Sequence, residues 1–396
     1  MPAEPQRAGG GSPAPGKLRV EHVDSEARLL ALVAAWRELA KQAAENNKLM
    51  EPATALPAWR HLEGGAGIDW LFVWHDGGGG ERLVGVFALA ARPPALGLPF
   101  RVTEVWRHAL GYLGTPLAHR QYVEEAVSAV LGWLEARGGG PRLLRLRQLA
   151  ADGPVLAAFR TAIAARGWPA ITFDAHVRAV LMSDSAGADY LRASLGGKRL
   201  KHYRRLEKRL GDRGKLGFEL LTGRDEIARG AEEFLALEKA GWKGRRGTAL
   251  AQDDASCAYF DEMMTDLAAE DGVRIPRLAL DGRPLAVAIL LTSGDAAWLY
   301  KIAYDEAHAR HSPGALLVVE LTRRLLDDGE FRFVDSCAEP DHPMIDHIWR
   351  ERVAMTDLIA VMRSGILPPS VIFNAVRAAR AARAAAKRVF SLARGR

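Results

Sequence analysis

A short polar segment that ends at Gly314 has the residue types of a phosphate-binding loop. It reads His308-Ala-Arg-His-Ser-Pro-Gly and lies between a predicted strand and a predicted helix. Ser312 is suited to cap that helix, and Pro313 suits its first position, where a missing N–H costs nothing. A helix start presents free N–H groups and the positive end of the helix dipole, which favours a phosphate or pyrophosphate. We expect this loop to be exposed, with Gly314 letting a phosphate approach the backbone.

Three antiparallel strands precede this loop, and a helix and a further strand follow it. Asp281-Gly282 and Ser293-Gly294 separate the strands, because glycine supplies the positive φ that hairpin turns need. The following residues then change to the apolar spacing of a helix. The predicted elements are strands over 277–280, 285–292 and 296–304, a helix over 315–326 and a strand over 331–337.

This order of elements resembles the core of an acyl-CoA N-acyltransferase of the GNAT superfamily. Three motifs add to the resemblance: Glu238–Gly244 (EKAGWKG), Tyr300–Asp305 (YKIAYD) and Ser312–Leu317 (SPGALL). Together they resemble the acetyltransferase domain of the CelD/BcsL group, which is associated with cellulose and exopolysaccharide biosynthesis. The resemblance covers about residues 195–361. It implies acetyl-CoA or another acyl-CoA as co-substrate and direct attack on the thioester by an amino sugar, a sugar hydroxyl or a polysaccharide precursor.

The resemblance also implies which residues form the site. The strand over 298–305 should run beside the pantetheine arm of the acyl-CoA. The residues expected to bind this co-substrate are Tyr304, Arg310, His311, Ser312, Pro313, Gly314 and Ala315. Asp305 is the first candidate for the general base, followed by Glu238 and His308. The residues expected to bind the acceptor are Trp242, Lys243, Tyr300, Lys301 and His342.

Structural roles are open for several of these residues. Asp305 could pair with Arg310, and Glu238 could pair with Lys243. Trp242 could fill a core position instead of facing a sugar ring. Each motif taken singly is also compatible with an ordinary helix end or cap, so the prediction depends on all three motifs in order.

Beyond the last core strand, relatives often carry an aromatic–lysine pair after an acidic residue. Here the segment Glu339–Trp349 contains no lysine, so His342 or His347 would have to take its place. The histidines show no metal-ligand spacing, and we expect no metal. Of the two cysteines, Cys337 ends a predicted buried strand and is interpreted as a core thiol.

The chain contains a degenerate repeat. The hairpins over 70–91 and 277–292 occupy equivalent places in two similar series of elements. This predicts an α/β (α+β) fold of two tandem GNAT-like halves, related to the Fem-type transferases, each with a mostly antiparallel sheet flanked by helices. The predicted divisions are a disordered tail (1–16), an N-terminal half (17–185), a basic linker helix (186–215), an acyl-CoA-binding half (216–362) and a basic helical tail (363–396).

The two predicted halves differ where a phosphate would bind. In the first half, a strand over 102–113 is followed by Gly114-Thr-Pro-Leu-Ala, without a Ser-Pro-Gly helix start. We therefore expect the C-terminal half to hold the acyl-CoA and the N-terminal half to shape the acceptor cleft between them.

Length and composition agree with a two-domain enzyme. The chain has 396 residues, of which 48% are hydrophobic. No apolar run reaches the roughly 18–20 residues of a membrane span, and the Pro/Gly-rich start lacks the apolar region of a signal peptide. Two cysteines suit a reducing compartment. These features predict a cytoplasmic protein.

Two segments are strongly basic. The linker contains Lys198, Arg199, Lys201, Arg204, Arg205, Lys208 and Arg209, opposite a face of leucines. A cationic arm that meets phosphates and a solvated bridging helix are equally compatible with this pattern. From Leu358 onward the chain has eight basic residues and no acidic one. That tail could contact an anionic membrane, although a solvated helical tail is the simpler interpretation.

Two other functions fit the same fold. One is a Fem-type transferase that moves an aminoacyl group from tRNA to a cell-wall precursor, and only this alternative includes a nucleic acid. The basic helix favours it, but that helix is shorter than the helical-hairpin arm of such enzymes. The other is a catalytically degenerate binding protein, against which the three retained motifs argue.

Overall fold

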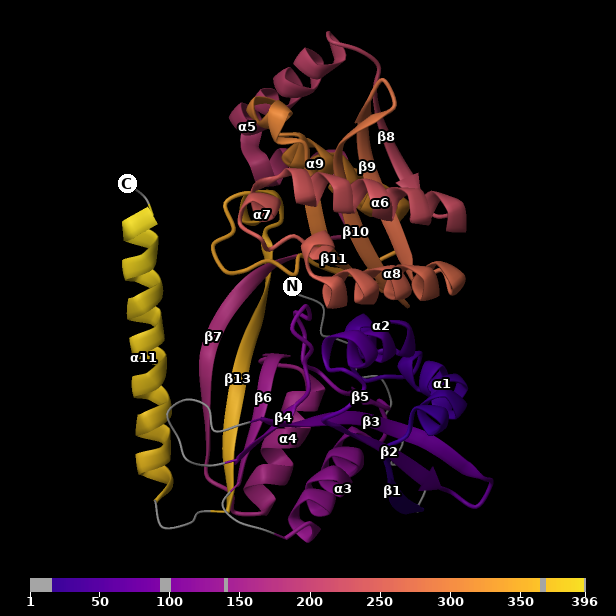
Figure 1. The fold of residues 1–396 in the computed structure, drawn as a ribbon, viewed down its shortest axis with the longest axis vertical. Coiled ribbons are helices and arrows are strands. Elements are labelled where there is room, and N and C mark those ends of the chain that lie inside the picture. The colour runs from indigo at the N-terminus through magenta and orange to yellow at the C-terminus, as the bar shows by residue number, and fades with distance from the viewer. Residues whose placement is uncertain (1–15, 93–100, 139–141, 364–367, 395–396) are drawn as a thin grey trace, which may run out of the picture.

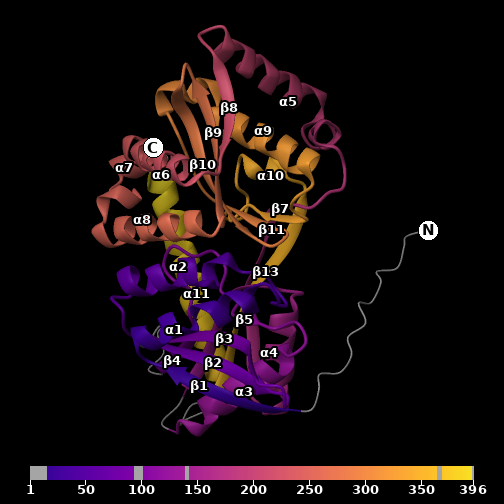
Figure 2. The ribbon, with the colours of Figure 1, turned by 90° about the vertical axis from the view of Figure 1, so that its right-hand side faces the viewer.

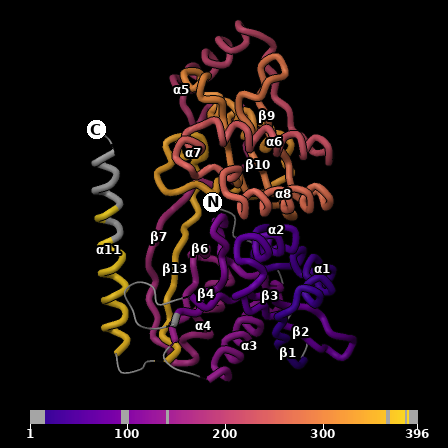
Figure 3. Tube along the Cα trace, in the orientation of Figure 1, coloured from indigo at the N-terminus to yellow at the C-terminus, as the bar shows by residue number. Residues whose placement is uncertain are grey.

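The computed structural model describes residues 16–92, 101–138, 142–363 and 368–394 (Figure 3). The tail predicted over 1–16 lies outside the described residues except for Gly16. Among the described residues, no helix is both long enough and apolar enough to cross a membrane.

The N-terminal half alternates strands and helices up to Leu181. Its elements are β1 (Lys17–Val23), α1 (Glu26–Ala40), η1 (Lys48–Met50), α2 (Pro52–Pro57), η2 (Ala58–Leu62), β2 (Ile68–Asp76), β3 (Glu81–Arg92), β4 (Arg101–Val105), β5 (Leu117–Ala118), α3 (Val123–Ala136), β6 (Arg142–Ala150), α4 (Pro154–Ala165) and β7 (Ala170–Leu181).

A long helix, α5 (Gly187–Gly211), leads to the C-terminal half. The elements that follow are β8 (Leu216–Leu221), α6 (Arg224–Ala240), α7 (Trp242–Arg245), η3 (Leu250–Gln252), α8 (Asp254–Ala269), β9 (Val273–Leu280), β10 (Arg283–Ser293), β11 (Ala296–Tyr304), η4 (Glu306–His311), α9 (Pro313–Asp328), β12 (Phe333–Asp335), α10 (Ile345–Ile348), β13 (Glu351–Arg363) and α11 (Pro369–Arg394).

The strands form one mixed sheet flanked by helices, which confirms the predicted fold class. Its order is β1-β2-β3-β4-β6-β13-β7-β12-β11-β10-β9-β8, and β5 pairs with β3. The pairs β4–β6 and β11–β12 are parallel, and the other pairs are antiparallel. In Figure 1 the long strands β7 and β13 run side by side and join the lower half to the upper half.

The sheet has a pseudo-twofold topology. If β1, β2, β3, β4, β6 and β7 correspond to β8, β9, β10, β11, β12 and β13, the strand order reads the same from either end. The repeat predicted from the sequence is therefore present. The sequence predicts a separate sheet in each half, but β13 inserts between β6 and β7, and β7 in turn pairs with β12. Each half thus completes its sheet with a strand of the other.

One predicted strand is shorter than expected. The strand predicted over 102–113 ends at Val105. The chain leaves the sheet there because the next residues pack between the halves. The Trp106 ring packs edge-on against Trp70 with 5.5 Å between centroids. The carbonyl oxygen of Leu110 accepts a hydrogen bond of 3.0 Å from the Tyr300 hydroxyl of β11.

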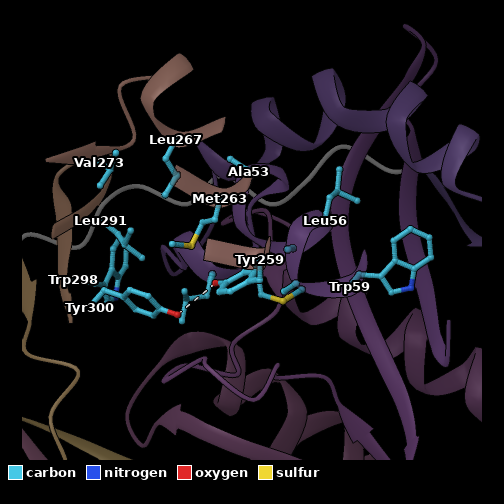
Figure 4. Packing of buried hydrophobic residues seen from close by; sticks show 14 of the residues in the cluster. Ala53, Leu56, Trp59, Tyr259, Met263, Leu267, Val273, Leu291, Trp298 and Tyr300 are labelled. Carbon is cyan, nitrogen blue, oxygen red and sulfur yellow. Dashed lines mark hydrogen bonds between the residues drawn. The ribbon is translucent and has the colours of Figure 1, made fainter. Parts of the chain in front are cut away.

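The two halves also share a hydrophobic core. Figure 4 shows Ala53, Leu56 and Trp59 of the first half in one cluster with Tyr259, Met263, Leu267, Val273, Leu291, Trp298 and Tyr300 of the second. Beside this cluster the buried Lys48 ammonium lies 2.8 Å from the carboxylates of both Glu51 and Glu270. The helices α2 and α8 therefore form a second, non-sheet contact between the halves (Figure 2).

The basic tail forms helix α11, and its first turns are packed against the sheet. Ile372 and Val376 are buried in a cluster with Val102, Leu143, Ile359 and Val361. Further along, the Arg380 guanidinium lies 4.6 Å from the centre of the Phe173 ring. The interpretation as a fully solvated tail is therefore wrong for this part. Membrane contact by the tail stays a prediction.

We predict that Ile372→Ala lowers the free energy of unfolding by about 2–5 kcal/mol, because it leaves a cavity in this cluster. The neighbouring Val371 is 44% exposed. Val371→Ala is the matched control and should change stability by less than about 0.5 kcal/mol. Urea denaturation of both variants measures the difference. Equal midpoints would show that α11 does not depend on this packing.

Candidate active site

A notch opens in the sheet where β11 and β12 part. The two strands pair only from Ala296 opposite Phe333 to Trp298 opposite Asp335. Beyond that point β11 continues to Tyr304. Its register with β10 shifts so that Tyr300 is an extra residue, a bulge that bends the strand. One edge of β11 therefore has backbone groups without a strand partner among the described residues.

The loop after β11 ends in the helix start that the sequence predicted, but its cap differs. Asp305 caps η4: its carboxylate accepts hydrogen bonds of 2.9 Å from the Ala307 N–H and 2.9 Å from His308 Nδ1. Ser312 precedes α9 in the left-handed conformation (φ 50°), and its hydroxyl makes no capping hydrogen bond. Ser312 is thus the N-cap residue of α9, as predicted, but it makes no side-chain capping hydrogen bond. The first N–H groups of α9 therefore remain open to an external acceptor.

Positive groups surround this helix start. His311 is 6% exposed, and its Nδ1 has no hydrogen-bond partner in the described structure. Burial lowers the pKa of His311, and the nearby charges of Arg213, Arg310, His308 and Arg209 lower it further. Arg209 and Arg213 come from the end of α5 and the turn after it, so the basic linker contributes to the field at the N-terminus of α9.

The loop is less exposed than we expected. Pro313, Gly314 and Ala315 are all buried. A Cβ added to Gly314 would lie 3.5 Å from Cδ1 of Tyr304, which is ordinary van der Waals contact. An alanine therefore fits at this position without any ligand, whereas a much larger side chain would collide with Tyr304.

A cluster of charged side chains, Lys301, Lys243 and Glu238, lies next to the β11 bulge. Lys301 is 9% exposed. Burial and the nearby Lys243 ammonium lower its pKa to about 8, although Glu238 and Cys337 oppose the shift. The Glu238 carboxylate is already engaged, because it accepts 2.6 Å from Lys243 Nζ and 2.8 Å from the Leu250 N–H. The cluster therefore contains two ammonium groups, those of Lys243 and Lys301, but only one carboxylate, that of Glu238.

The N-terminal half contributes Tyr112 to this cluster. Its ring centre lies 5.7 Å from that of Tyr300. Burial raises the pKa of Tyr112 to about 12, with smaller contributions from Cys337, Glu238 and Glu339. Sequence reasoning missed Tyr112 because it placed this segment in a strand. The flanking Gly111 and Gly114 were the available signal for a loop.

The predicted acceptor residues fall into two groups. Trp242 and Lys243 line a small cavity together with Glu238, Tyr304 and Glu306. The Trp242 side chain is 44% exposed, so it does not fill a core position.

Tyr300 and His342 lie elsewhere. The Tyr300 ring is buried between the halves. The ring nitrogen Nδ1 of His342 accepts from the Met344 N–H at 3.3 Å, just before α10. Of the predicted structural pairs, Glu238–Lys243 is present, whereas Asp305 pairs with His308 instead of Arg310.

The equivalent notch in the first half is filled by its own chain. There β4 and β6 part after Glu104 and Arg145. The Gly114 N–H donates to the Gln148 carbonyl oxygen at 3.2 Å. A Cβ on Gly114 would lie 2.2 Å from the carbonyl oxygen of Arg147. The chain itself therefore lies in this notch, whereas the edge of β11 beyond Trp298 has no strand partner among the described residues.

Comparison with known proteins agrees with this geometry. Residues 197–342 match the acetyltransferase (GNAT) domain family. FemX has a similar structure (TM-score 0.53, 12% identity), covering 86% of this chain and 96% of that one. The C-terminal domain (DUF2156) of an Agrobacterium fabrum protein described as a lysylphosphatidylglycerol synthetase also has a similar structure (TM-score 0.52, 13% identity). The match covers 85% of this chain and 92% of that one.

A conserved protein of unknown function from Bacteroides thetaiotaomicron is also similar (TM-score 0.50, 9% identity), covering 87% of this chain and 100% of that one. No curated protein matches the chain in sequence. At these identities the solved structures show the fold alone. The match over 197–342 identifies a GNAT acetyltransferase domain, and the protein is an acyltransferase. The described residues contain no group of three or more His, Cys, Asp or Glu side chains that could hold a metal ion.

We predict that Lys301 titrates near pH 8 in the folded protein. The shift follows from the lost hydration of its ammonium group and from repulsion by Lys243. Side-chain NMR of labelled lysine, assigned with Lys301→Met, measures the midpoint. The urea-unfolded chain is the control and should titrate near 10.4. A folded-state midpoint near 10 would contradict the buried placement.

Proposed function

We propose that this protein transfers an acyl group from acyl-CoA, most simply acetyl-CoA, to an amine or hydroxyl of a sugar or polysaccharide precursor. The observation that carries the proposal is the notch between β11 and β12, which leads directly to the uncapped N-terminus of α9. An acyl-CoA can use both features, because its pantetheine arm can pair with a strand edge and its diphosphate can bind a helix N-terminus. The acceptor class rests on the resemblance described above and on the exposed Trp242 ring.

The donor would be bound mainly by the backbone. The free edge of β11 can exchange hydrogen bonds with the amides of the pantetheine arm, as a further strand would. At the end of that edge the N–H groups of Gly314 and Ala315 point to the diphosphate position. His311, Arg310 and the guanidinium groups of Arg209 and Arg213 add positive charge there.

The cluster at the bulge would supply the proton transfers. The acceptor nitrogen or oxygen forms a bond to the thioester carbonyl carbon, and the carbon–sulfur bond breaks. Neutral Lys301 takes the proton that the acceptor loses, since its pKa of about 8 is close to neutral pH. Tyr112 stays protonated at that pH and can donate a proton to the leaving thiolate. N–H groups on the free edge of β11 can stabilise the oxyanion.

Asp305 remains a second candidate for the base. Its carboxylate bonds His308 beside the phosphate loop. It lies five residues beyond Tyr300, which corresponds to roughly 16 Å along a strand. Lys301 is directly next to the bulge, so we favour Lys301 for the proton transfer and a turn-capping role for Asp305.

An aminoacyl-tRNA donor is the alternative that the structure favours next. The exposed cations of α5 are the observation that supports it. Calorimetric titration with acetyl-CoA separates the two donors, because a tRNA-dependent enzyme would not need to bind free acyl-CoA.

We predict that Gly314→Ala weakens acetyl-CoA binding about tenfold or more, because the methyl group separates the phosphate from the N–H groups of α9. The variant should fold normally, since the methyl fits against Tyr304. Calorimetric titration measures the change. Gly132→Ala, on helix α3 of the other half, is the matched control and should bind like the parent. Unchanged binding by Gly314→Ala would place the donor elsewhere.

We predict that kcat of the parent enzyme rises with pH through about 8, because Lys301 loses its proton there. Lys301→Met should remove this rise and lower kcat by about 10²–10⁴-fold with little change in acetyl-CoA affinity. Asp305→Asn should keep the pH dependence. The reverse pattern, with the rise lost only in Asp305→Asn, would assign the base to Asp305.

A further inference from the structure

A groove of 340 Å³ is lined by residues of the linker helix α5 and of α9. Its floor is the outer face of β8 and β9, where Phe218 and Leu278 lie. Tyr203 and Arg204 line it from α5, and Leu316 and Val319 line it from α9. In Figure 2, α5 and α9 lie on the same side of these strands, opposite α6 and α8. The groove therefore has an apolar floor and an aromatic ring beside a cation.

The groove begins at the proposed diphosphate position. Leu316 is three residues after Pro313, so it lies only about one helical turn from the start of α9. Helix α5 runs along the groove, and its far end brings Arg209 close to His311. The groove therefore lies within about one helical turn of the proposed diphosphate position.

The helix α5 divides into two faces. Leu206 and Leu210 are buried against the second half. The opposite face is exposed, and none of its cations has an ion-pair partner among the described residues. These cations are Lys198, Lys201, Arg204, Arg205 and Lys208.

The acidic residues that line the groove do not cancel this charge. The carboxylate of Glu320 is bonded to Arg323 and Arg324, and Glu207 is exposed at the rim. The Arg324 guanidinium also lies 4.3 Å from the centre of the Phe218 ring. The groove as a whole is cationic and amphipathic.

We propose that this groove binds the adenosine 3′-phosphate end of the acyl-CoA. The Tyr203 ring offers a stacking surface for the adenine base, Leu316 and Val319 cover its edge, and Arg204 meets the 3′-phosphate. A nucleotide needs this combination of an aromatic face, an apolar wall and a guanidinium. The proposal rests on the proposed function, and it gives the basic linker a role in binding the donor.

The test compares CoA with 4′-phosphopantetheine, which lacks the nucleotide but keeps the pantetheine arm. Calorimetric titration of the full chain should give tighter binding for CoA. Tyr203→Ala and Arg204→Ser should each weaken CoA binding by about fivefold or more and leave 4′-phosphopantetheine unchanged. Arg192→Ser is the control, since Arg192 lies before the kink of α5 at Gly196 and pairs with Asp189.

The outcomes separate the two proposals. If both groove variants bind CoA like the parent while Gly314→Ala weakens both ligands, the groove inference is overturned and the donor site stands. If Gly314→Ala also has no effect on either ligand, the proposed function fails as well. Equal weakening of CoA and 4′-phosphopantetheine by Tyr203→Ala would show a general effect on α5 and would also overturn the groove inference. Melting temperatures of all variants check that each is folded.

Discussion

The antiparallel pairing of β7 with β13 is the constraint on which the rest of the structure depends. These strands exchange places, so each completes the sheet of the half to which it does not belong in sequence. An ion pair with a buried carboxylate stabilises the exchange on each side. Asp335, the last paired residue of β12, bonds Arg178 of β7. Arg145, the equivalent residue of β6, lies 3.4 Å from Asp357 of β13, with the signs reversed. Removing Arg178 would leave the buried Asp335 carboxylate without its ion-pair partner, which is costly.

This constraint explains why the candidate site draws on both halves. Because β12 is held between β7 and β11, the notch beside it has a fixed position relative to the N-terminal half. The segment after β4 then reaches across and places Tyr112 beside Tyr300. The repeat has diverged in function through the same segment. In the first half it fills the notch at Gly114, whereas in the second half the equivalent edge of β11 has no strand partner among the described residues.

Much of the fold and part of the candidate site were predictable from local sequence. Turn residues such as Asp281-Gly282 and the apolar run after them located the strands that carry the site, and Ser-Pro-Gly located the helix start. The exchange of β7 and β13 was not predictable, because a strand with two strand neighbours has the same apolar pattern whichever neighbours it has. The position of Tyr112 beside Tyr300 depends on a contact between distant segments. The left-handed backbone of Ser312 had no local signal, since serine is an ordinary capping residue.

The place of β13 in the chain has a consequence for biosynthesis. Its partners β6 and β7 are complete by residue 181, but β13 does not begin until residue 351. At ordinary ribosomal speeds this interval lasts on the order of 10 s. During that time both edges that β13 will cover are unpaired, and exposed strand edges favour association with other chains. We therefore expect the N-terminal half to depend on protection while it is being made, and to become stable only when nearly the whole polypeptide has left the ribosome.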